Sequence, residues 1–178
     1  MSQITYIKGD LLDFPNDIDV LHHGCNIHGT MGAGIALQIA KRYPEAARVD
    51  KICHEAGTNK LGTCSVADIG KGKKIINLYQ QTLNPDENGK SLDFDALYSS
   101  MLQAVDYLNG YYCDERRNPD PSISRIKLGF PKGLGSGLAV GCRQGFDPYI
   151  WNIVEAMIKA TFGRNNYDIV IVEFDPNA

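Results

Sequence analysis

The sequence predicts an α/β protein, a three-layer α/β/α fold with a mixed, largely parallel central sheet. Short apolar runs rich in β-branched residues alternate with longer segments whose apolar residues recur at helical spacing. Strands that alternate with helices in this way are typical of βαβ units, whose helices cover both faces of the sheet. No internal repeat, low-complexity tract or linker interrupts the pattern, so we expect residues 1–178 to form a single domain.

The N-terminal half is expected to contain several strands and two helices. The predicted strands are residues 4–8, 18–22, 64–69 and 74–79. The stretch after His23 is rich in glycine, which favours a loop over the interior of an element. One helix is expected over residues 34–43, closed by Pro44, and a second over residues 44–56, followed by Gly57.

The C-terminal half is expected to contain two helices and two strands. Residues 92–108 carry a helical stripe, namely Phe94, Leu97, Tyr98, Met101, Val105 and Leu108. Strands are predicted over residues 126–130 and 168–174. The last helix is expected to start at Asp147, an N-cap with Pro148 at the first helical position.

Charge and hydropathy exclude several classes of protein. The chain has 18 basic and 21 acidic residues, a formal charge of −3 and a pI near 5.8, which argues against a broad nucleic-acid-binding surface. No apolar run approaches the ~18 residues of a membrane-spanning helix, and the N-terminus lacks the pattern of a secretory signal. We therefore expect a cytoplasmic monomer that binds a small molecule and neither a membrane nor nucleic acid.

Cysteine and histidine usage predicts no metal site. The 5 cysteines form no C-x-x-C pair, so neither a disulfide framework nor a tetrahedral zinc site is expected. His22 and His23 are adjacent, and on a strand they point to opposite faces, which argues against a shared metal. We expect no metal and no cofactor.

Two glycine-rich loops carry the functional signal. One follows the strand at residues 18–22 and the other the strand at residues 126–130. Ligands of open α/β sheets bind beyond the carboxyl ends of the strands, where glycines let backbone N–H groups approach an anion. The helix behind the first loop adds its positive N-terminus, so the two loops together predict a diphosphate site. The alternative is that the glycines serve tight turns only, since neither loop matches a P-loop or G-x-G-x-x-G.

Four stretches in this order resemble the macrodomain family, and in particular its stand-alone branch of yeast-type ADP-ribose-1″-phosphate phosphatases. They are YIKGDLL, HHGCN, GTMGAGIALQIAKRYPEA and GFPKGLGSGLAVG. The match is strongest over residues 1–65 and carries little signal over residues 84–124. The resemblance implies a single macrodomain over residues 1–178, with a crevice for ADP-ribose or ADP-ribose 1″-phosphate.

The resemblance also implies which residues bind this ligand. Asp10 would accept a hydrogen bond from the adenine amino group, the alternative being an aspartate that only shapes a turn. Asn26 would lie against the distal ribose. The full set of implied binding residues is Gly9, Asp10, Leu11, Gly32, Ala33, Gly34, Ile35, Ala36, Gly133, Gly135, Ser136, Gly137 and Leu138.

His23, Asn26 and Asp147 are the catalytic candidates that the resemblance implies. An imidazole at His23 could donate a proton to the leaving oxygen or orient a water, whereas the alternative is a packed histidine at a strand end. Asp147 could activate water, but the intervening CRQGF departs from the family spacing and helix capping alone explains an Asp-Pro pair. Cys25 and His28 are further candidates with weaker support.

A second departure bears on the reaction. Macrodomains that remove ADP-ribose from acidic side chains use a nucleophilic lysine and a loop aspartate, and this chain has Gln81 and Ala139 at the aligned positions. A glutamine amide is no comparable nucleophile. The sequence therefore favours hydrolysis of ADP-ribose 1″-phosphate. The alternatives are a non-catalytic ADP-ribose-binding module, an ADP-ribosyl hydrolase acting on modified macromolecules, and an α/β domain without a ligand.

Overall fold

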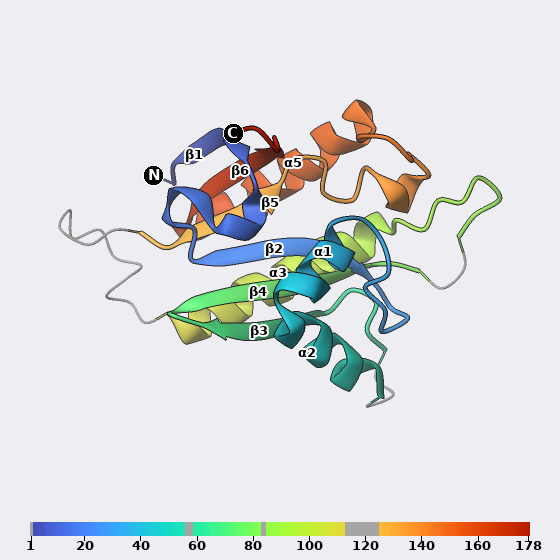
Figure 1. Cartoon of the computed structure of the whole chain (residues 1–178), viewed down its shortest axis with the longest axis horizontal. Coiled ribbons are helices and arrows are strands. Elements are labelled where there is room, and N and C mark those ends of the chain that lie inside the picture. Colours follow the sequence, from blue (N-terminus) through green and yellow to red (C-terminus); the bar gives the residue numbers. More distant parts are fainter. Residues whose placement is uncertain (1, 56–58, 83–84, 113–124) are drawn as a thin grey trace.

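A six-stranded sheet in the order β1-β6-β5-β2-β4-β3 forms the centre of the protein (Figure 1). The structure is a computed structural model that describes residues 2–55, 59–82, 85–112 and 125–178. The strands are β1 (Ile4–Gly9), β2 (Val20–Asn26), β3 (Cys64–Gly70), β4 (Lys73–Gln81), β5 (Lys127–Pro131) and β6 (Asp168–Phe174). Neighbouring strands are parallel except β3 and β4, which are antiparallel. The predicted mixed, largely parallel sheet is confirmed.

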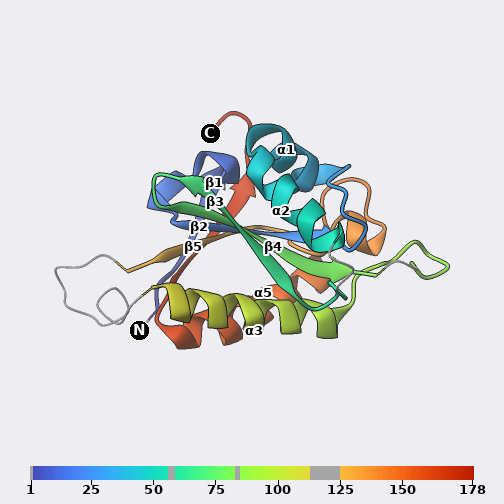
Figure 2. The same ribbon diagram turned by 90° about the horizontal axis from the view of Figure 1, so that it is seen from below.

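Helices cover both faces of this sheet, as the alternation of strands and helices predicted. They are α1 (Gly34–Arg42), α2 (Pro44–Glu55), α3 (Phe94–Tyr111) and α5 (Pro148–Phe162). Figure 2 shows α1 and α2 on one side of the sheet and α3 and α5 on the other. The three-layer arrangement is confirmed. Within the described part of the chain, no helix has the length and apolar character needed to span a membrane.

Helix α5 begins where its capping pattern predicted. The Asp147 side chain accepts hydrogen bonds from the backbone N–H groups of Tyr149 and Ile150, and Pro148 occupies the first turn. These bonds satisfy donors that have no partner within the helix. The capping role of Asp147 is therefore confirmed.

The buried stripe of α3 is rotated from the predicted one. Leu97, Met101 and Leu108 face the core as expected, but Phe94 and Tyr98 are exposed. Ala96, Ser100 and Ala104 are buried in their place. Residues 94, 98 and 102 follow one i, i+4 ridge, and this ridge lies on the solvent side of the ridge that packs on the sheet.

Strand β2 is longer than predicted and lies further along the chain. It was expected over residues 18–22 but runs over Val20–Asn26, so the glycine-rich stretch starts inside the sheet. The Gln80 side chain occupies the space beside Gly24, and a Cβ on Gly24 would lie 2.0 Å from Gln80 Nε2. A residue with a side chain would therefore not fit at this position of the strand. Glycine at this position reflects close packing and not a loop.

Because β2 and β5 are adjacent parallel strands, the loops that follow them leave the same edge of the sheet. The adjacent histidines of β2 point to opposite faces, as predicted. His22 stacks on Phe130 on the α3 and α5 side. The His23 ring contacts Asn77, whose amide donates to the α2 carbonyl of Ala46 on the other side.

Candidate functional site

The loops after β2 and β5 line one cavity of about 640 Å³, called here the larger compartment. From the first loop and the start of α1 it is lined by Asn26, Thr30, Gly32, Ala33, Gly34, Ile35 and Ala36. From the second loop it is lined by Lys132, Gly133, Leu134, Gly135, Gly137, Leu138 and Ala139. Loops far apart in sequence therefore meet around one space at the carboxyl end of the strands.

The start of α1 and the glycines of both loops bring backbone groups to the walls of the larger compartment. Helix α1 starts at its edge, and its N-cap residue Ala33 offers no side-chain oxygen to the first N–H groups. Uncapped N–H groups at a helix start form an anion site together with the helix dipole. In the second loop Gly133 has a φ of +90°, and a Cβ there would lie 2.8 Å from the Phe146 ring. Only glycine fits this turn.

A smaller compartment of about 590 Å³ continues the cleft. It shares Ile35, Pro131, Lys132 and Phe174 with the larger one. Asp10 lies in its wall, where one carboxylate oxygen accepts the Leu12 N–H at 2.9 Å and the other lies 3.6 Å from the Arg42 guanidinium. Asp10 thus shapes a turn and also presents a partly exposed carboxylate to the cleft. Leu11 lines the same compartment.

The lining of the larger compartment suits an anion. Among the described residues that line it there is no aspartate, glutamate or histidine, and its charged side chains are Lys132 and Arg143. Lys132 is paired with Glu173 at 3.1 Å. A negatively charged ligand would therefore meet backbone N–H groups and Arg143, with no carboxylate among the described lining residues.

Two of the expected binding residues support the cleft without lining it. The Gly9 carbonyl accepts the N–H of Asp175. Ser136 is fully buried, where its hydroxyl donates to the Gly133 carbonyl at 2.8 Å and its own carbonyl accepts the Asp147 N–H at 2.7 Å. Both residues hold neighbouring backbone in place. The remaining expected binding residues line one compartment or both.

His23 lies beneath the cavity wall and not in it. Its ring is fully buried, and Nε2 lies 2.6 Å from Asn77 Oδ1. The Asn77 amide nitrogen donates to the Ala46 carbonyl and to Ser65 Oγ, so Oδ1 accepts and His23 Nε2 carries the proton. Burial lowers the pKa of His23 to about 4, which keeps the ring neutral. A catalytic role for His23 stays a prediction.

Cys25 separates His23 from the larger compartment. Its Sγ lies 3.6 Å from His23 Nε2, and the residue forms part of the cavity wall. Burial raises the pKa of the Cys25 thiol well above its ordinary value, so the sulfur is protonated and a poor nucleophile.

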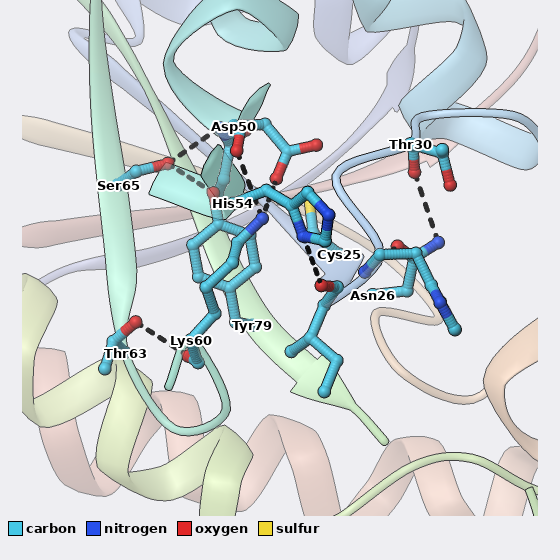
Figure 3. A network of polar contacts seen from close by, with 12 residues as sticks. Cys25, Asn26, Thr30, Asp50, His54, Lys60, Thr63, Ser65 and Tyr79 are labelled. Carbon is cyan, nitrogen blue, oxygen red and sulfur yellow. Dashed lines mark hydrogen bonds and ion pairs between the residues drawn. The ribbon is translucent and has the colours of Figure 1, made fainter. Parts of the chain in front are cut away.

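A buried polar network extends from His23 through Asn77 toward α2. Figure 3 shows its members Asp50, Lys60, Ser65 and Tyr79. Asn77 contacts Ser65, and Ser65 Oγ lies 2.7 Å from the Tyr79 hydroxyl. Lys60 Nζ lies 4.2 Å from the centre of the Tyr79 ring and donates to Asp50 Oδ1 at 2.6 Å. The network binds the backbone of α2 at the carbonyls of Ala46 and Asp50.

The other catalytic candidates have structural partners of their own. Asn26 lines the larger compartment, while its amide donates to the Thr30 carbonyl at 3.2 Å and accepts the His28 N–H at 2.9 Å. Asp147 caps α5 and lines neither compartment. Gln81 and Ala139, the residues expected at the lysine and aspartate positions of the other branch, both line the cavity.

Among the cleft residues that were missed from the sequence, three have side chains that bear on ligand binding. Phe174 is 70% exposed and lies at the border of the two compartments, where an aromatic ring can stack on a base. The Gln80 amide lies between Gly24 and Gly135, and its buried Oε1 has no hydrogen-bond partner among the described residues. Arg143 belongs to the CRQGF segment. An exposed aromatic at the end of the last strand was the one available signal.

Comparisons with known proteins agree with this geometry. No family model matches the chain. It is 29% identical over 177 residues to an uncharacterized 17.5 kDa protein of Enterobacteria phage T4, covering 97% of both chains. It is 45% identical over 65 residues to the ADP-ribose 1″-phosphate phosphatase of Saccharomyces cerevisiae, a stretch that covers 36% of this chain and 37% of that enzyme.

A solved structure extends the similarity to the whole chain. The macrodomain of Mycobacterium tuberculosis DarG superposes with a TM-score of 0.69 and 26% identity, covering 97% of this chain and 98% of that one. The resemblance to macrodomains predicted from four short motifs is confirmed.

Proposed function

We propose, from the premise that this chain is a macrodomain, that its cleft binds ADP-ribose and hydrolyses ADP-ribose 1″-phosphate to ADP-ribose and inorganic phosphate. The observation that carries the proposal is the meeting of two glycine-rich loops around a compartment whose described lining has no acidic side chain. The adjoining compartment, with Asp10 in its wall and Phe174 at its border, would take the adenosine. The similarity to the yeast phosphatase supports the choice of reaction.

In this proposal the backbone supplies most of the chemistry. The N–H groups at the start of α1 and around Gly133 to Gly137 hold the diphosphate and stabilise charge that develops during phosphate release. Asn26, whose amide is oriented by Thr30, lies against the distal ribose. Water supplies the hydroxyl and the proton that the two products gain. His23 and Asp147 act from behind the wall, by fixing Cys25 and the second loop.

Ligand binding is tested first by thermal shift. ADP-ribose should raise the melting temperature more than equal concentrations of ADP, AMP or NAD, because a ligand stabilises the folded state according to its excess over Kd. Equal shifts from ADP and ADP-ribose would remove the distal ribose from the site. Asp10→Ala, which deletes the proposed adenine acceptor, should weaken ADP-ribose about 5- to 10-fold.

Turnover is tested by phosphate release from ADP-ribose 1″-phosphate. His23→Ala should lower the rate of phosphate release, because the His23 ring is proposed to position Cys25. The matched control is His22→Ala, on the opposite face of β2. Unchanged release by a folded His23→Ala protein would remove His23 from the reaction.

A non-catalytic ADP-ribose-binding module is the second candidate. The same observation favours it, because the described lining of the larger compartment offers no imidazole or carboxylate to act as general acid or base. ADP-ribose binding without phosphate release would select this candidate. Gln81 and Ala139 in the wall count against release of ADP-ribose from modified macromolecules, which an assay on such a substrate checks directly.

A further inference from the structure

The CRQGF segment forms a small closed loop at the wall of the larger compartment. The Cys142 N–H donates to the Gly137 carbonyl at 3.1 Å, and the Asp147 N–H donates to the Ser136 carbonyl at 2.7 Å. A Cβ on Gly137 would lie 3.4 Å from the Gly145 carbonyl oxygen, so the loop packs directly on the second glycine loop. These contacts hold Arg143 at the cavity wall.

Arg143 differs from the other cation of this wall in its partners and in its place. Lys132 is bound to Glu173 and lies at the border with the smaller compartment. Arg143 is exposed, lines only the larger compartment, and has no ion pair with a described residue. It shares that compartment with Asn26 and Gln81, away from the end where Asp10 lies. Its guanidinium is free to bind an anion.

We propose that Arg143 selects ligands that carry a phosphate group on the distal ribose over ADP-ribose itself. The inference rests on the proposed function, because it takes the loop amides to be occupied by the diphosphate. A phosphomonoester adds up to two further negative charges at neutral pH, and a guanidinium binds such a group with two parallel hydrogen bonds. ADP-ribose lacks this group, so Arg143 adds affinity only for the phosphorylated ligand.

The test compares two ligands on four proteins. Binding of ADP-ribose is measured by calorimetry, and ADP-ribose 1″-phosphate is measured by calorimetry or, where phosphate is released, by KM and kcat. Arg143→Gln should weaken binding of the phosphorylated ligand about 5- to 20-fold and binding of ADP-ribose less than about 2-fold. Arg143→Lys should fall between Arg143→Gln and the wild type, because it keeps the charge without the two-pronged geometry.

Arg164→Gln is the matched control, since Arg164 is exposed and lines neither compartment. It makes the same change in net charge and should leave both affinities unchanged. Equal weakening of both ligands by Arg143→Gln would assign Arg143 to the diphosphate and overturn the inference, as would no weakening at all. Wild-type protein that binds neither ligand would overturn the proposed function together with the inference.

Discussion

The two faces of β2 place the same residue type in opposite environments. On one face the His22 ring stacks on Phe130 with centroids 4.4 Å apart, and neither ring nitrogen makes a hydrogen bond of good geometry to a described residue. On the other face His23 is bonded to Asn77 at 2.6 Å. Burial lowers both pKa values, to about 3 for His22 and about 4 for His23. His22 behaves as an apolar ring, whereas His23 is one member of a polar network.

The contrast extends to the layers on either side. The face under α3 and α5, called here the apolar face, is built from aliphatic and aromatic side chains. The face under α2, called here the polar face, buries an ion pair between Lys60 and Asp50. Both faces reach the wall of the larger compartment, the polar face through Cys25 and the apolar face through Leu134. Buried polar groups are costly unless all are satisfied, so we expect the stability of the polar face to depend on its hydrogen bonds and its ion pair.

The largest loss in the free energy of unfolding is expected from breaking the buried ion pair of the polar face. Lys60→Met leaves the Asp50 carboxylate, whose side chain is 2% exposed, without its partner. Removing one member of a buried pair costs about 3–5 kcal/mol. Urea unfolding should therefore show a fall of that size in the free energy of unfolding.

Lys51→Met is the control for this substitution. Lys51 pairs with Glu55 on the same helix, but both side chains are largely exposed. Exposed pairs contribute about 0–1 kcal/mol. Equal losses from Lys60→Met and Lys51→Met would remove the distinction between the polar face and an ordinary surface.

Acid should destabilise the protein through both histidines. Each has a folded-state pKa below its unfolded value near 6.5, so the unfolded state binds more protons as the pH falls. The stabilisation is complete above about pH 6.5 and is lost as the pH falls toward 4 for His23 and toward 3 for His22. Between pH 7 and pH 5 each histidine should lower the free energy of unfolding by about 2 kcal/mol. Urea unfolding at both pH values measures this loss.

His22→Leu separates the two contributions. It removes the His22 titration while it keeps an apolar side chain of similar volume against Phe130. The loss between pH 7 and pH 5 should then fall by about half. A His22→Leu protein with the wild-type pH dependence would show that the acid sensitivity arises elsewhere.

Much of the fold followed from local patterns in the sequence. Period-two and helical spacing located the strands and helices, and Asp147 with Pro148 located the start of α5. The predicted end of β2 was wrong. The glycine at position 24 reflects its contact with Gln80 of another strand, and no local sequence pattern records such a tertiary contact.

That one error also explains the placement of His23. If β2 ended near His22, the next residue would lie at the edge of the sheet and face the cleft. Since the strand continues to Asn26, His23 lies inside the sheet, and Cys25 takes the place at the wall. The places of Arg143 and Gln80 also depend on tertiary contacts. The packing of the CRQGF loop on the second glycine loop places Arg143. The close approach of Gly24 and Gly135 places the Gln80 amide.

The smallest difference in the free energy of unfolding is expected when one buried serine on each face is replaced by alanine. Ser65 Oγ contacts both the Tyr79 hydroxyl and the Asn77 amide, so Ser65→Ala leaves two buried groups short of a partner and should cost about 1–2 kcal/mol. Ser100 on α3 donates only to the Leu97 carbonyl of its own helix, which keeps its helical bond after Ser100→Ala. That change should stay within about 0.5 kcal/mol. Urea unfolding of the two variants compares the faces at a single hydroxyl, and equal losses would mean that Ser65 contributes no more than local packing.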